Sequence, residues 1–210
     1  VFTMSDADEP SLRRRAETVG QGQPFIEIKV IDPETGAIVP PNTPGELCCR
    51  GYNVMKGYYN MPEETARTIS PDGWLHSGDL GTMDEDGYVR VTGRIKDMII
   101  RGGENVYPRE IEEFYLTHPK VKDVQVIGVP SEAYGEEVMA CVILKEGEEM
   151  TEEEVKEFVG ARMAKHKVPR YVRFVDSFPT NAAGKIQKFK MREEAIEILK
   201  LQTAASIETA

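Results

Sequence analysis

The chain has 210 residues, of which 40% are hydrophobic and 30% charged, and its formal net charge is −10. This composition is ordinary for a globular protein, and the excess of negative charge argues against a general nucleic-acid-binding function. No run of about 18 apolar residues occurs, so we expect no membrane-spanning helix. The three cysteines show no metal-ligand spacing and two of them are adjacent, which predicts reduced, buried thiols and a cytoplasmic location.

Charge is distributed unevenly along the chain. Residues 146–157 contain seven Glu against one Lys, which we interpret as the solvated first turns of a helix. Residues 165–192 contain eight Lys or Arg against Asp176 alone. This basic run is either a solvated face or a binding surface for an anionic ligand, and the sequence leaves both interpretations open.

Residues 1–92 are predicted to consist mainly of strands and turns. Apolar and polar residues alternate through FIEIKVID, as in a half-buried strand, and the Asp86-Gly87 pair is typical of a hairpin turn. The first 20 residues are polar, and we expect them to be irregular. The elements expected here are a strand at 25–32, a turn at 33–36, a strand near 46–50, a helix at 62–68 and a hairpin over 79–92.

From residue 94 onward the pattern changes to strands mixed with helices, which indicates an α+β domain. Thr151 followed by Glu154 predicts a capping box at a helix start. We place the boundary between the two parts at Gly93–Lys96 and expect the tail after residue 201 to be frayed. The elements expected in the second part are a hairpin over 94–107, a helix over 108–117, strands at 121–129, 138–145 and 172–175, and a last helix over 186–200.

Three short motifs stand out, although each has an ordinary structural explanation. Asp79 in HSGD is either a turn residue or a carboxylate that accepts hydrogen bonds from two ribose hydroxyls. Arg94 would by default form a surface ion pair, and Gly102-Gly103 a tight hairpin turn. Lys185 follows a glycine but lacks the spacing of a Walker motif, so alone it indicates only an exposed loop lysine.

Together, the order and spacing of these motifs resemble those of the acyl-adenylate-forming superfamily. That superfamily includes acyl-CoA and aryl-CoA synthetases, luciferases and the adenylation domains of peptide synthetases. The resemblance covers the chain from residue 18 onward. The segments that carry it are GYYNMPEET, DGWLHSGDLG, GYVRVTGRIKDMIIRGGENVYPREIE and PTNAAGKIQK.

The resemblance implies a fold and a domain organisation. Residues 1–92 would be the C-terminal, β-barrel-like part of a large domain, 93–96 a hinge, and 97–210 the complete small α+β domain. The family's Ser/Thr/Gly-rich phosphate loop, its acid-binding pocket and its motif for adenine and Mg²⁺ have no counterpart in this sequence. The chain is therefore expected to be a C-terminal fragment that is inactive alone and has no metal ligands of its own.

The resemblance also implies a reaction in two steps. A carboxylate attacks the α-phosphate of Mg·ATP to give acyl-AMP and pyrophosphate, and coenzyme A (CoA) then displaces AMP to give a thioester. By resemblance, Asp79 and Arg94 contact the nucleotide, and Lys185 stabilises the charge that builds during adenylation. Lys96 would be the hinge residue that lets the small domain turn between the two steps.

In the second step the resemblance places another set of residues beside CoA. Its members are loop residues that approach the pantetheine arm and groups suited to adenine stacking or phosphate binding. Each side chain among them has a structural alternative as a surface charge or a packed aromatic. The set is Gly102, Gly103, Glu104, Tyr134, Lys165, His166, Lys167 and Arg170.

The loop GGENVYP favours the fatty-acyl-CoA and aryl-CoA ligases over the peptide-synthetase domains, and a fatty acid is the preferred substrate. The alternatives are an aryl-CoA ligase, another adenylate-forming enzyme, or a non-catalytic binding module of the same fold. The expected ligands are a carboxylic acid, ATP with Mg²⁺, and CoA, with no nucleic-acid partner. The resemblance is also compatible with a homodimer of the full-length enzyme.

Overall fold

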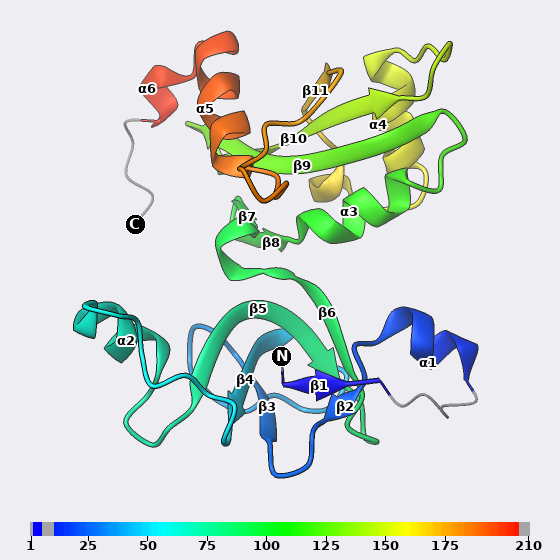
Figure 1. Ribbon diagram of the computed structural model, residues 1–210. Coiled ribbons are helices and arrows are strands. Elements are labelled where there is room, and N and C mark those ends of the chain that lie inside the picture. Colours follow the sequence, from blue (N-terminus) through cyan, green and yellow to red (C-terminus); the bar gives the residue numbers. More distant parts are fainter. Residues whose placement is uncertain (1, 6–10, 206–210) are drawn as a thin grey trace. The chain divides into compact units, whose positions relative to one another are not determined.

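The computed structural model describes residues 2–5 and 11–205, and the chain divides into two compact units, Val1–Lys96 and Asp97–Ala210. Figure 1 shows that each unit contains a main sheet of its own. Each unit also has its own apolar clusters. The fold is mixed α+β, as the sequence predicted. Within the described ranges, every helix is too short or too polar to cross a membrane.

The first unit is built on an antiparallel sheet in which four strands pair in sequence order. Val30, Leu47 and Val89 form an apolar cluster, whereas Cys48 packs in a second cluster with Trp74. Leu47 and Cys48 serve different clusters because successive side chains of a strand point to opposite faces. The strands are β3 (Glu27–Ile31), β4 (Gly45–Arg50), β5 (Leu75–Met83) and β6 (Val89–Arg94).

Strands β3 and β6 are the first and last strands of this sheet, and Val89 of β6 also exchanges backbone hydrogen bonds with Val19 and Gly20. The predicted helix is confirmed as α2 (Pro62–Thr68). The hairpin predicted over 79–92 is also confirmed, because β5 pairs with β6 from Asp79 onward; the strand β5 itself begins earlier, at Leu75, where it pairs with β4. Oδ1 of Asp84 accepts hydrogen bonds from the N–H groups of Asp86 and Tyr88, and these bonds fix its turn.

The prediction that the first 20 residues are irregular is wrong where the structure describes them. A short helix, α1, spans Leu12–Glu17, and β1 (Thr3–Met4) pairs with β2 (Gln21–Gly22). Ser11 caps α1, since its hydroxyl accepts the N–H of Arg14 at 3.3 Å. None of the residues in α1 is buried, so the helix lacks the apolar periodicity by which a sequence reveals helices. Residue 1 and residues 6–10 lie outside the described ranges.

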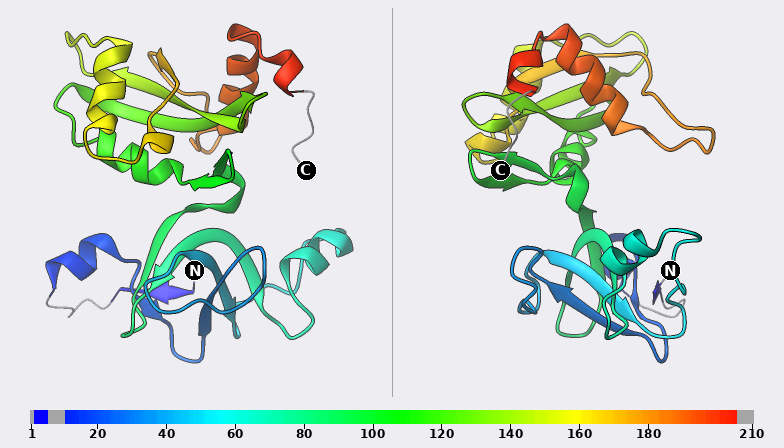
Figure 2. Two further views of the ribbon diagram at one scale, coloured as in Figure 1. Left: turned by 180° about the vertical axis from the view of Figure 1, so that it is seen from behind. Right: turned by 90° about the vertical axis from the view of Figure 1, so that its left-hand side faces the viewer.

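The second unit has helices on both faces of a five-stranded sheet (Figures 1 and 2). Its strands β9 and β10 are antiparallel neighbours, β11 pairs parallel to β10, and a short hairpin of β7 and β8 joins the start of β10. The strands are β7 (Ile99–Arg101), β8 (Glu104–Val106), β9 (Val121–Ser131), β10 (Gly135–Leu144) and β11 (Tyr171–Phe174). The helices are α3 (Pro108–Tyr115), α4 (Glu152–Gly160), α5 (Lys188–Ile198) and α6 (Gln202–Ala205).

Strand β10 is buried on both faces. Val138 and Ala140 belong to the core that includes α3 and α4, and the intervening Met139 belongs to the cluster that includes α5. A strand covered on both sides needs an apolar residue at every position, which explains the continuous run VMACVIL. The capping box at the start of α4 is confirmed, because Thr151 and Glu154 exchange side chain-to-backbone hydrogen bonds of 3.2 and 2.7 Å.

Three boundaries differ from the prediction. The hairpin expected over 94–107 is shorter, because Ile95–Asp97 forms a 3₁₀ turn before β7. Helix α5 begins at Lys188 rather than at residue 186, because Ile186 is held in a β-bridge with Thr180. Helix α6 continues the chain past residue 201, where fraying was expected, and residues 206–210 lie outside the described part.

Candidate functional site

Asp79 and Arg94, the two residues predicted to contact a nucleotide, are paired with each other in the register of β5 and β6. Nε of Arg94 donates to Oδ1 of Asp79 at 3.2 Å. The side chain of Arg94 is 57% exposed and that of Asp79 is 34% exposed, so both groups are open to solvent. The surface ion pair that Arg94 was expected to form by default therefore exists, and its partner is the other predicted nucleotide ligand.

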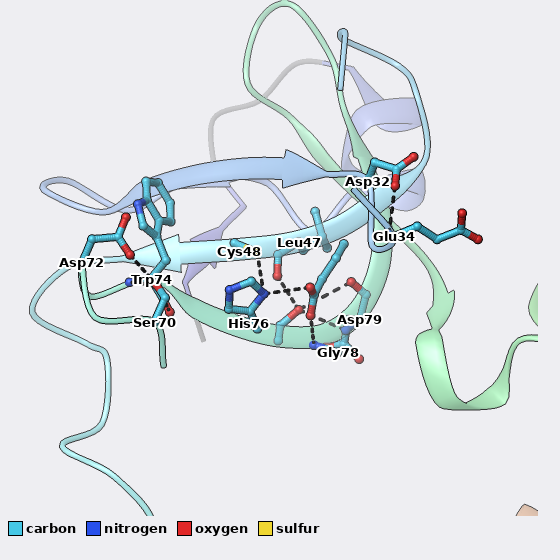
Figure 3. A network of polar contacts seen from close by, with 12 residues as sticks. Asp32, Glu34, Leu47, Cys48, Ser70, Asp72, Trp74, His76, Gly78 and Asp79 are labelled. Atoms are coloured by element: carbon cyan, nitrogen blue, oxygen red, sulfur yellow. Dashed lines mark hydrogen bonds and ion pairs between the residues drawn. The ribbon is translucent and has the colours of Figure 1, made fainter. Parts of the chain in front are cut away.

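The backbone before Asp79 is fixed by polar contacts to β4. The hydroxyl of Ser77 donates to the C=O of Leu47 at 2.6 Å and accepts the N–H of Asp79 at 3.0 Å. Gly78, at a φ of +69°, donates its N–H to Oε1 of Glu46 at 3.0 Å. Figure 3 shows these contacts converging just before Asp79. The sequence analysis overlooked Glu46, although a glutamate inside an otherwise apolar strand, GELCC, is an unusual signal.

Glu46 also gathers two further polar side chains, which we name with it the Glu46 cluster: Glu46, Cys48 and His76 (Figure 3). Nδ1 of His76 donates to Oε2 of Glu46 at 2.9 Å and lies 3.7 Å from Sγ of Cys48. Burial, and after it the charge of Glu46, raises the pKa of the Cys48 thiol to about 12. The expectation of buried, reduced cysteines is confirmed for all three.

The Glu46 cluster brings together donor groups that the sequence analysis did not connect. Within the described residues it is the one group of three His, Cys, Asp or Glu side chains whose donor atoms lie within 4.8 Å of one another. Sequence spacing did not reveal it because His76 lies on the next strand, where the pairing of β4 with β5 places it opposite Cys48.

Lys185, the predicted adenylation residue, lies at the tip of a tight loop and is exposed. Oδ1 of Asn181 accepts the N–H groups of Ala183 and Lys185 at 3.0 and 2.9 Å, and the N–H of Asn181 donates to the C=O of Lys185. Gly184 has a φ of +76°, as this turn requires. The loop thus presents a lysine on a backbone that its own asparagine holds in place.

The predicted CoA loop and Tyr134 lie against each other. Gly102 and Gly103 form the turn of the β7–β8 hairpin with φ values of +60° and +86°, as the two-glycine turn predicted. The N–H of Gly102 donates to the C=O of Tyr134 at 2.8 Å. The guanidinium of Arg101 lies 4.6 Å from the centre of the Tyr134 ring and also pairs with the buried Glu137.

Tyr134 and Arg170 line one open cavity of about 350 Å³, together with Glu137 and Tyr171. The structure therefore brings together two of the groups predicted to hold the nucleotide end of CoA. Arg101 was not singled out from the sequence, although its stacking on Tyr134 orients that ring.

The other predicted residues are more dispersed. Lys165, His166 and Lys167 form a 3₁₀ turn in which Lys165 is exposed, and Lys167 pairs with Glu110 at 2.7 Å. Glu104 is exposed at the start of β8. Lys96, the predicted hinge residue, is exposed within the 3₁₀ turn Ile95–Asp97 and is the last residue of the first unit.

Half of the basic run 165–192 is neutralised by carboxylates. Four of its eight cations form ion pairs: Lys167 with Glu110, Arg173 with Glu194, Lys188 with Glu112 and Arg192 with Glu136. These ion pairs therefore connect α5 and neighbouring segments to other elements of the second unit. Lys165, Arg170, Lys185 and Lys190 remain as exposed cations that a phosphate could approach.

Comparisons with known proteins identify the class. Residues 1–59 match the family described as AMP-binding enzyme, and residues 110–185 match the one described as AMP-binding enzyme C-terminal domain. The chain belongs to this family of adenylate-forming enzymes, as its motifs indicated.

Individual relatives indicate which enzymes within this class the chain is similar to in sequence. The chain is 52% identical over 204 residues to a putative acyl-CoA synthetase, YngI, of Bacillus subtilis, a match that covers 97% of the chain and 37% of YngI. It is 48% identical to the mitochondrial medium-chain acyl-CoA ligase ACSF2 of Bos taurus, with coverage of 95% and 32%. The chain thus spans about a third of the length of these curated relatives.

Solved structures agree with the sequence relatives. ATP-bound MatB from Rhodopseudomonas palustris superposes with a TM-score of 0.82 at 42% identity, covering 87% of this chain and 36% of MatB. The anthranilate CoA ligase AuaEII in complex with anthranoyl-AMP gives a TM-score of 0.82 at 30% identity, covering 96% and 38%.

Proposed function

We propose that the chain is the C-terminal portion of an ATP-dependent acid–CoA ligase that forms an acyl-AMP and then an acyl-CoA thioester. The observation that carries this proposal is the 52% identity to an acyl-CoA synthetase across 97% of the chain, which includes both units. The arrangement of the candidate residues supports it: an exposed Asp79–Arg94 pair in one unit and an exposed loop lysine in the other.

In the first step, a carboxylate oxygen of the acid attacks the α-phosphorus of ATP, and pyrophosphate leaves. Asp79 and Arg94 would hold the ribose and phosphate, and the ammonium of Lys185 would stabilise the negative charge that develops. In the second step, the CoA sulfur attacks the acyl carbonyl, and AMP leaves. Gly102 and Gly103 would then let the backbone approach the pantetheine arm, with Tyr134 and Arg170 at the nucleotide end.

Mg²⁺ would accompany ATP, and its ligands are expected outside this chain. The one cluster of ligating side chains among the described residues contains a thiol, which does not suit Mg²⁺. A medium-chain fatty acid is the proposed substrate, because the ACSF2 relatives bear that specificity in their name. The cytoplasmic location and the homodimer stay predictions, and the same relatives are described as mitochondrial.

A chimera tests the proposal. Residues 1–210 replace the matching segment of bovine ACSF2, and acyl-AMP formation is followed by pyrophosphate exchange while thioester formation is followed with CoA. We expect both activities with a medium-chain fatty acid and neither with the 210-residue chain alone. A folded chimera that binds ATP but forms no acyl-AMP would support the non-catalytic alternative, and a preference for aromatic acids would support an aryl-CoA ligase.

A further inference from the structure

The Glu46 cluster combines three kinds of donor that bind borderline-soft metal ions, and the adenylate-forming reaction assigns no role to it. We propose that Glu46, Cys48 and His76 form a binding site for a divalent cation of the zinc class, with carboxylate, thiolate and imidazole as its protein ligands.

The strand pairing explains why these donors meet. Glu46 and Cys48 are two residues apart on β4, so their side chains start from the same side of the strand. His76 is the pairing partner of Cys48 on β5, and the register between the strands shifts between Glu46 and Cys48. The shift brings the carboxylate beside the imidazole, so that all three donor atoms lie within 4.8 Å of one another.

The distances from His76 to Cys48 and to Glu46 are close to those between neighbouring ligands of a tetrahedral ion. With zinc bonds of about 2.3 Å to sulfur and about 2.1 Å to nitrogen or oxygen, neighbouring donors are about 3.4–3.6 Å apart. Sγ of Cys48 and Nδ1 of His76 are 3.7 Å apart, which needs almost no movement. Nδ1 of His76 and Oε2 of Glu46 are 2.9 Å apart. This pair would open by about 0.5 Å when the hydrogen bond gives way to two metal bonds. On binding, His76 takes the tautomer with its proton on Nε2, and the Cys48 thiol releases its proton to solvent, as metal binding by a thiol requires.

The carboxylate is already oriented for this role. Its other oxygen, Oε1, accepts the N–H of Gly78 at 3.0 Å, and outer hydrogen bonds of this kind fix metal ligands in place. Because that bond uses Oε1, and not the oxygen in contact with His76, it can persist when Oε2 binds the ion. The backbone before Asp79 therefore needs no rearrangement.

Burial and ligand type indicate which ions fit. Cys48 is fully buried, the side chain of Glu46 is 10% exposed and that of His76 is 33% exposed, so an ion would enter from the imidazole side. Water would complete the coordination, as in other zinc sites with three protein ligands. Thiolate and imidazole favour Zn²⁺, Co²⁺ and Cd²⁺, whereas Mg²⁺ and Ca²⁺ prefer oxygen ligands only.

Cobalt titration of the 210-residue chain tests the proposal without reference to catalysis. We expect one Co²⁺ per chain, with tetrahedral absorption bands in the visible range and a thiolate-to-cobalt charge-transfer band, both abolished by Zn²⁺. Cys48→Ser and His76→Gln should each weaken binding by more than about 10-fold, the smallest loss expected even for an outer-shell partner. Cys49→Ser is the matched control, because this buried thiol is the next residue on β4 and lies outside the cluster, and it should bind as the unmodified chain does.

Thermal unfolding covers the case in which Cys48→Ser does not fold. Zn²⁺ should raise the Tm of the unmodified chain and of Cys49→Ser, because an ion that binds only the folded state stabilises it. It should not raise the Tm of His76→Gln, which changes the exposed edge of the cluster. Absence of the charge-transfer band, or an equal rise of Tm with Zn²⁺ in His76→Gln, would overturn the proposal. The role of Glu46 would then be only structural, through its hydrogen bond with Gly78.

Discussion

Arg94 and Asp79 face each other across the β5–β6 hairpin, and the guanidinium already uses one oxygen of the carboxylate. Two residues predicted separately as nucleotide ligands are thus one structural unit. Because both side chains are substantially exposed, the ion pair itself adds little to stability. The proposed role for the pair is to hold each partner in place until a ribose or phosphate replaces or shares the contact.

Replacing Asp79 with Ala should therefore affect nucleotide binding far more than folding. In the ACSF2 chimera we expect the KM for ATP to rise about 10- to 100-fold, the range for losing a hydrogen bond to a charged group. The free energy of unfolding of the 210-residue chain should change by less than about 1 kcal/mol. Asp176→Ala, at another exposed aspartate, should change neither quantity. An unchanged KM for ATP in Asp79→Ala would exclude the ribose-binding role.

Asn181 should act as a positioning residue for Lys185. Its Oδ1 accepts two backbone N–H groups of the loop, one of them that of Lys185. Asn181→Ala removes both bonds, and we expect acyl-AMP formation in the chimera to fall about 10-fold, in keeping with two neutral hydrogen bonds. Asn181→Asp keeps the acceptor oxygen and should restore most of the rate. Equal losses in both variants would show that the amide acts in some other way.

The sequence predicted the elements whose signals are local. Thr151 and Glu154 define a capping box within four residues, and Pro62 marks the start of α2, so both helices were placed correctly. Helix α1 was missed because a short polar helix with no buried residue has no periodic signal. The start of α5 was misplaced because the β-bridge between Thr180 and Ile186, a contact within the loop, overrides the helical tendency of the segment.

Only those residues of the candidate site that belong to recognisable motifs could be predicted from the sequence. Asp79, Arg94 and Lys185 came from recognisable segments, but nothing in the sequence pairs Asp79 with Arg94 or places Asn181 beneath Lys185. The Glu46 cluster depends on the pairing of β4 with β5 and on a register shift, both of which belong to tertiary structure. From the sequence, the basic run could be either a surface for an anionic ligand or a solvated face. Its ion pairs could not be foreseen, because carboxylate partners such as Glu110 and Glu112 lie elsewhere in the chain.

The Arg101–Glu137 pair should be essential for the stability of the second unit. Glu137 is 2% exposed and accepts two hydrogen bonds from the Arg101 guanidinium, at 2.6 and 3.0 Å. Arg101→Met leaves the carboxylate buried without its partner and should cost about 3–5 kcal/mol, whereas adding Glu137→Met should recover most of the loss. Urea unfolding followed by circular dichroism measures both.

Trp74 provides an internal control for that experiment. It is the single tryptophan of the chain and lies in the first unit, so its fluorescence reports on that unit. The fluorescence transition should keep its midpoint in Arg101→Met. If the double variant were as unstable as Arg101→Met, the buried charge would not be the cause of the loss.

Lys96 should matter for the second half-reaction alone. Proline at this position fixes φ and restricts the preceding residue, so the 3₁₀ turn Ile95–Asp97 loses the freedom that a hinge requires. In the chimera, Lys96→Pro should retain pyrophosphate exchange and lose thioester formation. Lys96→Ala, which keeps backbone freedom, should retain both. Equal loss of the two activities in Lys96→Pro would reject the hinge role.

The most direct test of an acid–CoA ligase built on this chain is to measure the two half-reactions separately in the Lys185→Ala chimera. Acyl-AMP formation should fall by about 10²–10³, the loss typical of one electrostatic contact to developing charge. Thioester formation from preformed acyl-AMP and CoA should continue near the unmodified rate, as it should in Lys190→Ala, an exposed lysine on α5 that serves as the matched control. Full acyl-AMP formation by Lys185→Ala would contradict the account.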